Sequence, residues 1–242
     1  METEQVSAGL APVKRTHRWG LGAFVLVEVV YLLASVAFVV LFGGDSSLPI
    51  GLIVIVVTFP AVLAAGLAVL ITKLRGNGPR TDLRLHWTWR GLGIGLLFGV
   101  GGFLVTVPAS MLYISIVGPE ATSAAAEVFA GVRANWAWAV VVFLIVVFVV
   151  PACEEIIYRG LLWGALDWRW GRWVALAITT VVFALAHLEF TRTPLLLVVA
   201  LPIALARLYS DSLLASIVAH QVNNLLPGVV VLLSLIGMMP VA

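Results

Sequence analysis

The sequence predicts an all-α protein that crosses a membrane several times, and its composition and apolar runs carry that prediction. Of its 242 residues, 62% are hydrophobic and only 11% are charged, and the mean hydropathy is +1.12. A soluble domain has about 25% charged residues, so this chain lacks the charge to cover a surface that faces water. The apolar residues fall in runs long enough to cross a bilayer as helices. We therefore expect a transmembrane helical bundle in contact with lipid, and no nucleic-acid partner.

About eight apolar runs are candidates for membrane spans, given that a helix needs roughly 20 such residues to cross. The first is longer than a signal-peptide core and lacks a small-residue cleavage site, so we expect it to be retained. The third is glycine-rich, which suits close helix packing in lipid. The fourth continues through Pro151, and the last three are shorter. The runs lie near residues 19–42, 48–72, 91–117, 136–166, 172–188, 194–208, 212–226 and 227–239.

The distribution of basic residues predicts how the bundle is oriented. Of the fourteen Lys and Arg residues, all but Arg133, Arg159 and Arg192 lie in the N-terminal tail or in loops on the same side of the membrane. Basic loops stay in the cytoplasm, so both termini are predicted to be cytoplasmic, in a multi-pass protein of the cell membrane. The single cysteine, Cys153, allows no disulfide within the chain and fits a small buried side chain.

Polar side chains inside three of the later runs supply the groups that a catalytic site needs. A charged side chain in hydrocarbon costs at least about 2.5–3.5 kcal/mol, so we expect these residues to share one site. They are Glu154, Glu155 and Arg159 in FVVPACEEIIYRGLLWG, His187 in TTVVFALAHLEF, and His220 and Asn224 in ASIVAHQVNNLL.

The predicted topology brings these side chains to similar depths. Glu154 precedes the turn after the fourth run by about 15 residues, and His187 follows it by about 17, or about 23 and 26 Å along two antiparallel helices. His220 is about 15 Å along its helix from the next turn on that side. The three meet if the first hairpin extends roughly 10 Å into the cytoplasm, which its polar turn permits.

Local spacing assigns different surroundings to the two glutamates. Glu155 and Arg159 are four residues apart, so they can pair on one helix face. Glu154 points about 100° away from Glu155, because one residue turns an α-helix by that angle. It is therefore free to face a cavity and to act as a general base.

Three motifs in order resemble those of a known family. EEIIYR matches EExxxR, FALAH matches FxxxH and HQVNN matches HxxxN. Over about residues 90–240 the chain resembles the CPBP family of intramembrane endopeptidases, which includes CAAX prenyl proteases, bacteriocin-processing enzymes and Abi proteins. We accordingly divide it into a cytoplasmic tail (1–18), two N-terminal helices with a basic loop (19–90) and a CAAX-protease-like catalytic domain (91–242).

The resemblance implies a role for each motif residue. Glu154 activates a water molecule, helped by His187, while His220 and Asn224 stabilise the oxyanion of the tetrahedral intermediate. Glu155 and Arg159 support the site or bind a substrate terminus. Family members have been described both as metalloproteases and as metal-independent glutamate peptidases. The chain has no HExxH motif, yet Glu154, His187 and His220 could hold a divalent metal such as zinc. We expect no obligatory metal.

Other interpretations stay open at this point. Either histidine alone could be a hydrogen-bond partner between helices, and Asn223 could replace its neighbour Asn224. Glu28, alone in the first span, is left outside the site. The chain could be a non-proteolytic immunity or scaffold protein, or a proton-coupled transporter, although the repeated halves of a transporter are not evident. The expected substrate is a peptide or membrane-associated protein, with or without a prenyl group, and the sequence gives no oligomeric state.

Overall fold

The computed structural model describes residues 18–42, 48–118, 121 and 127–239, and all regular elements in these ranges are helices. The prediction of an all-α protein is therefore confirmed. The predicted cytoplasmic tail, residues 1–18, lies outside the described residues except for Arg18.

Each of the predicted runs contains a helix. The elements are α1 (Leu21–Phe42), α2 (Ile50–Arg75), α3 (Pro79–Asp82), α4 (Trp89–Val117), α6 (Trp136–Leu144), α7 (Val150–Glu155), α8 (Trp163–Trp170), α9 (Arg172–Ala186), α10 (Thr193–Ser210), α11 (Leu213–Asn223) and α12 (Leu225–Leu235). Among the described residues, five helices are long and apolar enough to cross a membrane, and α11 with α12, bent by 43°, makes a sixth when taken together. The apolar α9 is shorter, so the fold is compatible with the predicted bundle of about eight membrane segments.

Elements α6, α7 and α8 are parts of one helix of 35 residues, Trp136–Trp170, which we call the long helix. Two π-helical turns, Ile145–Val149 and Ile156–Leu162, separate its three α-helical parts. At 1.5 Å per residue the long helix extends about 52 Å, well beyond the roughly 30 Å hydrocarbon core. This length agrees with the expectation that its hairpin with α9 extends out of the bilayer.

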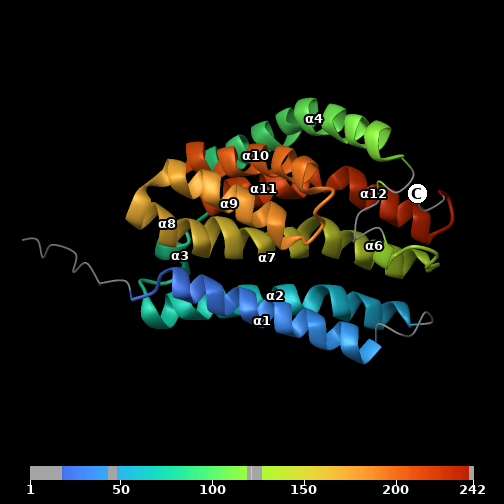
Figure 1. The fold of residues 1–242 in the computed structure, drawn as a ribbon, viewed down its shortest axis with the longest axis horizontal. Helices are drawn as coiled ribbons and strands as arrows, with labels where there is room; N and C mark the ends of the chain where they lie inside the picture. The colour runs from blue at the N-terminus through green and yellow to red at the C-terminus, as the bar shows by residue number, and fades with distance from the viewer. Residues whose placement is uncertain (1–17, 43–47, 119–120, 122–126, 240–242) are drawn as a thin grey trace, which may run out of the picture.

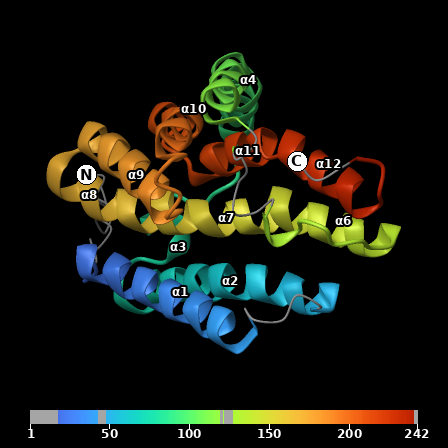
Figure 2. The ribbon, with the colours of Figure 1, turned by 45° about the vertical axis from the view of Figure 1, so that its right-hand side comes forward.

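The other helices pack on two sides of the long helix. Figures 1 and 2 show the α1–α2 pair on one side, helices α9 to α12 on the other, and α4 outermost. Helix α4 packs on α10 and α11, and both α2 and α11 contact the long helix at α7. The segment that carries the two glutamates is therefore enclosed between α2 and α11.

Glycines on one face of α4 allow it to approach α11 closely. A Cβ atom added to Gly95 would lie 2.7 Å from the carbonyl oxygen of Ala215, and one added to Gly99 would lie 2.7 Å from Cβ of Val222. Both distances are shorter than the closest approach of a real Cβ atom to another heavy atom, so neither position can hold a side chain without a shift of the helices. The glycine-rich composition of this run, predicted to favour close packing, is therefore explained by contact with α11.

Several of the basic residues assigned to the cytoplasmic side lie at one end of the bundle. The amide of Arg18 donates to the carbonyl oxygen of Arg75 at 2.8 Å, while Arg84 and Arg207 both contact Asp211. These contacts agree with a common side for the loops concerned. That this side faces the cytoplasm stays a prediction.

Candidate active site

The long helix places Glu155 and Arg159 on one face, where they form the predicted ion pair. Nη1 of Arg159 lies 3.0 Å from Oε1 of Glu155, and both side chains are completely buried. Isolated charges at this depth would be costly, so each group stabilises the other. The guanidinium also extends over the ring of Phe183, 4.3 Å from its centroid.

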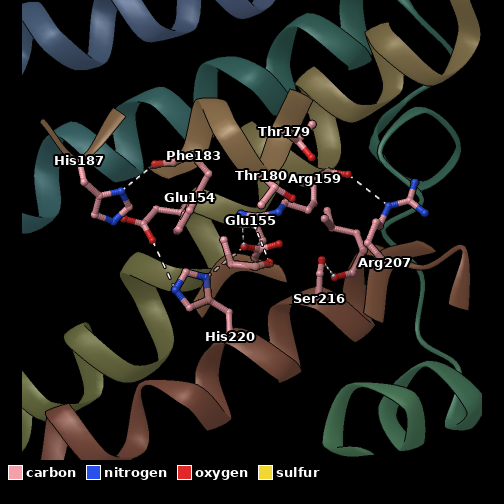
Figure 3. A network of polar contacts seen from close by, with 12 residues as sticks. Glu154, Glu155, Arg159, Thr179, Thr180, Phe183, His187, Arg207, Ser216 and His220 are labelled. Carbon is pink, nitrogen blue, oxygen red and sulfur yellow. Dashed lines mark hydrogen bonds and ion pairs between the residues drawn. The ribbon is translucent and has the colours of Figure 1, made fainter. Parts of the chain in front are cut away.

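His220 on α11 lies between the two neighbouring glutamates (Figure 3). Its Nδ1 is 3.0 Å from Oε1 of Glu155, and its Nε2 is 3.7 Å from Oε2 of Glu154. Glu155 is ionised in its pair with Arg159, and a carboxylate only accepts, so Nδ1 of His220 is the donor. The Nε2 atom is thereby turned toward Glu154.

Glu154 differs from Glu155 in its exposure. Its side chain is 19% exposed, whereas that of Glu155 is fully buried. In Figure 3 its carboxylate points toward the region between the two imidazoles. Of the two adjacent carboxylates, Glu154 is thus the one that a water molecule or a substrate can reach.

His187 follows the last residue of α9, where the helix ends. Its Nδ1 lies 2.8 Å from the carbonyl oxygen of Phe183. A carbonyl can only accept, so Nδ1 carries a hydrogen, and in a neutral ring Nε2 is then the basic nitrogen. Leu188 then adopts a left-handed backbone conformation (φ 57°), which turns the chain away toward α10.

The ring of Phe183 is the packing centre of the site. Its centroid lies 4.7 Å from that of His187, 5.6 Å from that of His220 and 5.3 Å from that of Tyr158. Phe183 is almost completely buried. The FxxxH motif therefore supplies the imidazole of His187 and also the aromatic ring that packs against both His187 and His220.

Asn224 lies at the break between α11 and α12, one turn beyond His220. Its side-chain amide donates to the carbonyl oxygen of Val146 on the long helix, at 3.1 Å. Of the two neighbouring asparagines, it is Asn224 whose side chain forms a hydrogen bond with the long helix. The sequence placed it beside His220, but gave no indication of a backbone acceptor on another helix.

Other polar residues that the sequence left outside the site lie against the long helix. Arg207 of α10 donates through Nε to the carbonyl oxygen of Arg159 at 3.2 Å, and Gln221 donates to that of Phe148 at 3.2 Å. Glu28 of α1 is next to Tyr158, one turn beyond Glu154. One oxygen of Glu28 is buried without a hydrogen-bond partner among the described residues. In the sequence, the only sign that Glu28 belongs near the site is that it is a charged residue within an apolar span.

The histidines and glutamates of the site meet only part of what a metal ion requires. Both histidines have one ring nitrogen engaged by an oxygen acceptor, as metal-ligating histidines do. However, among the described residues no three His, Cys, Asp or Glu side chains are grouped closely enough to hold an ion. The observed arrangement of these side chains therefore does not fit a metal centre.

Comparison with known protein families gives a match for part of the chain. Residues 136–226 match the family model described as type II CAAX prenyl endopeptidase Rce1-like. The match includes the long helix and α9 to α11, with all three motifs. Comparisons with curated proteins and with solved structures give no match. The region that contains Glu154, His187 and His220 is therefore similar to type II CAAX prenyl endopeptidases of the Rce1-like kind.

Proposed function

We propose that this protein is an intramembrane endopeptidase that hydrolyses a peptide bond of a membrane-associated protein or peptide, with Glu154 as the general base. The single observation that carries the proposal is the division of roles between adjacent carboxylates. Glu155 is buried and holds Arg159 and His220, whereas Glu154 is accessible and lies 3.7 Å from Nε2 of His220. A general base must be in contact with water, and the neighbouring carboxylate must hold the surrounding side chains in place.

In the proposed reaction Glu154 takes a proton from a water molecule, and the resulting hydroxide attacks the carbonyl carbon of the scissile bond. The free Nε2 of His187 accepts a hydrogen bond from the same water and orients it. The proton held on Glu154 then passes to the leaving amine as the carbon–nitrogen bond breaks. General acid–base catalysis of this kind contributes about 10²–10⁴-fold to the rate.

The oxyanion is proposed to be stabilised by His220 and Asn224. For this role Nε2 of His220 carries a proton while Nδ1 still donates to Glu155, so the ring acts as an imidazolium. The side-chain amide of Asn224 already donates one hydrogen to the carbonyl oxygen of Val146, which leaves its second hydrogen for the oxyanion. One such donor is worth about 2.7–4 kcal/mol in the transition state.

The site is proposed to work without an obligatory metal, and prenylated peptides are the first substrates to try. That class follows from the family description, type II CAAX prenyl endopeptidase. Any substrate of this protein must also be able to reach a site that is enclosed within a membrane protein.

The decisive experiment compares peptide termini in membranes that contain wild type or Glu154→Gln at equal folded levels. We expect new termini with wild type only, which would identify a substrate in the same measurement. The purified pair is then tested on a quenched-fluorescent peptide with a prenylated CAAX end. Identical termini together with an unchanged cellular effect of the variant would instead support a binding or immunity role. Proton-coupled solute uptake that requires Glu154 would support a transporter.

A further inference from the structure

The two π-helical turns of the long helix lie directly before and after α7, the segment that carries both glutamates. A π-turn contains one residue more than an α-turn, so residues beyond it are rotated by about 100° from their α-helical direction. Widened turns also leave backbone carbonyl oxygens without their usual donors. Inside a bilayer such groups must find partners within the protein.

Val146, in the first π-turn, has lost both of its ordinary backbone donors. The amide of Val150, its α-helical partner, bonds to the carbonyl oxygen of Ile145 instead. The next residue is Pro151, which has no N–H group. Asn224 donates its side-chain amide to this oxygen at 3.1 Å and so replaces the hydrogen that proline lacks.

A second side chain from the same region contacts the same turn. Gln221 precedes Asn224 by three residues, a spacing that places the two on one helix face. Its amide donates to the carbonyl oxygen of Phe148 at 3.2 Å. Two carbonyls of the first π-turn are therefore bound by α11 and its C-terminal end, immediately beside His220.

The second π-turn is held from α10 in the same way. In an α-helix the amide of Trp163 would bond to the carbonyl oxygen of Arg159, but here it bonds to those of Tyr158 and Gly160. Nε of Arg207 donates to the free Arg159 oxygen at 3.2 Å, as Figure 3 shows. The Arg207 guanidinium is almost fully buried, extends over the ring of Trp163, and donates to Asp211 at 3.0 Å.

We propose that Asn224, Gln221 and Arg207 are positioning residues that hold the two π-turns open and thereby set the rotation of α7, which directs Glu154 and Glu155 toward His220. Arg207 and Gln221 are not part of the three motifs. For Asn224 the proposal adds a backbone-binding role to the expected oxyanion role. The value of this rotation for catalysis rests on the proposed function, but the rotation itself can be measured without any cleavage reaction.

The only cysteine of the chain is a natural reporter of this rotation. Cys153 belongs to α7 and is packed against Ala61 and Ala65 of α2, with 8% of its surface exposed. If α7 rotates, the thiol leaves this contact. The rate at which a membrane-permeable maleimide labels Cys153 in the detergent-solubilised full chain therefore reports the state of the π-turns.

Matched pairs of variants separate the carbonyl bonds from general damage. Asn224→Leu is compared with Asn223→Leu, the same change at a neighbour whose side chain makes no hydrogen bond among the described residues. Arg207→Met is compared with Asp211→Asn, which removes the ion pair but leaves the bond to Arg159. Gln221→Leu, at a half-buried position, serves as a milder third variant in case the others fail to fold.

We expect Asn224→Leu and Arg207→Met to label on the order of tenfold faster than their controls, the factor that a lost hydrogen bond to a buried carbonyl commonly gives. Their melting temperatures are measured in parallel, and peptide cleavage should show a lower kcat with little change in KM. Pro151→Ala supplies a new backbone N–H close to Val146. Added to Asn224→Leu, it should return labelling toward the value of the single Pro151→Ala variant, while kcat stays low because leucine supplies no donor to the oxyanion.

The outcomes distinguish this inference from the proposed function. Wild-type labelling rates in Asn224→Leu, Arg207→Met and Gln221→Leu would overturn the inference, whether or not cleavage is lost. Lost cleavage at wild-type labelling would assign Asn224 to the oxyanion alone. If Pro151→Ala does not slow the labelling of Asn224→Leu, the idea that Asn224 replaces the N–H group missing from Pro151 is rejected. Fast labelling in the variants, together with a wild type that cleaves nothing, would support the inference and reject the peptidase.

Discussion

Glu155 and His220 are 65 residues apart in the sequence, yet their side chains meet at 3.0 Å through Oε1 of the glutamate and Nδ1 of the imidazole. The same carboxylate oxygen also accepts from Arg159 at 3.0 Å. One buried atom thus joins the long helix to α11 and fixes an imidazole beside Glu154. The same substitution at the two adjacent glutamates should therefore have different effects on stability.

Glu154→Gln should remove activity without loss of stability, whereas Glu155→Gln should reduce both. The first change affects a partly exposed carboxylate, and we expect cleavage to fall by about 10²–10⁴-fold. The second leaves the buried Arg159 without its counterion, which commonly costs about 3–5 kcal/mol. Thermal unfolding in detergent and cleavage rates measure the two effects. A Glu154→Gln enzyme that cleaves at the wild-type rate would falsify the assignment of the base.

His187→Gln tests the free imidazole nitrogen at the end of α9. Glutamine can keep a donor near the carbonyl of Phe183 but offers no basic nitrogen, so we expect kcat to fall by about 10²–10⁴-fold with a small change in melting temperature. His86→Gln, on an exposed loop residue, is the matched control and should behave as wild type. Equal activity in both variants would remove His187 from the mechanism.

Substitutions along α4 should show which of its faces packs against α11. A side chain at Gly99 meets Val222 at once, whereas one at Gly101 meets no atom within 4 Å among the described residues. Gly99→Leu should therefore lower the melting temperature in detergent, with overpacking costing about 1–3 kcal/mol. Gly101→Leu should leave it unchanged or raise it, because leucine favours a helix more than glycine does. Equal effects at both positions would contradict the observed packing.

Treatment with a chelator tests the proposal that no metal is required. No three His, Cys, Asp or Glu side chains of the described residues form a group suited to an ion. We therefore expect cleavage of the fluorescent peptide to be unchanged after prolonged incubation with 1,10-phenanthroline or EDTA. Loss of activity that added zinc restores would instead support Glu154, His187 and His220 as ligands that move together around a metal.

The sequence was informative where a single physical rule decides the outcome. Hydropathy predicted the helices, because the bilayer requires long apolar segments with internal hydrogen bonds. The four-residue spacing predicted the Glu155–Arg159 pair. The contact of Glu155 with His220 is different, because it depends on how two distant helices are rotated about their axes.

The π-turns could not be predicted from the apolar pattern, because an extra residue in a turn leaves hydropathy unchanged. Pro151 was a partial signal, since a proline within a span leaves a carbonyl without its donor. The identity of the replacement donor, Asn224, depends on the approach of α11. Arg207 was assigned to a loop by its charge, although it is buried at the end of α10. Its partner is a backbone oxygen, which no sequence motif records.

The extra residue in each π-turn also has a consequence for the evolution of related sequences. A turn of this kind can arise from the insertion of one residue into an α-helix, and it persists only while another helix supplies a donor for the released carbonyl. Relatives that have a hydrophobic residue at the position of Asn224 or Arg207 should therefore be one residue shorter in the corresponding turn. In aligned sequences, a single-residue gap before the paired glutamates should coincide with the loss of the polar residue that lies 78 positions beyond the bonded carbonyl, and a gap after them with the loss of the one 48 positions beyond.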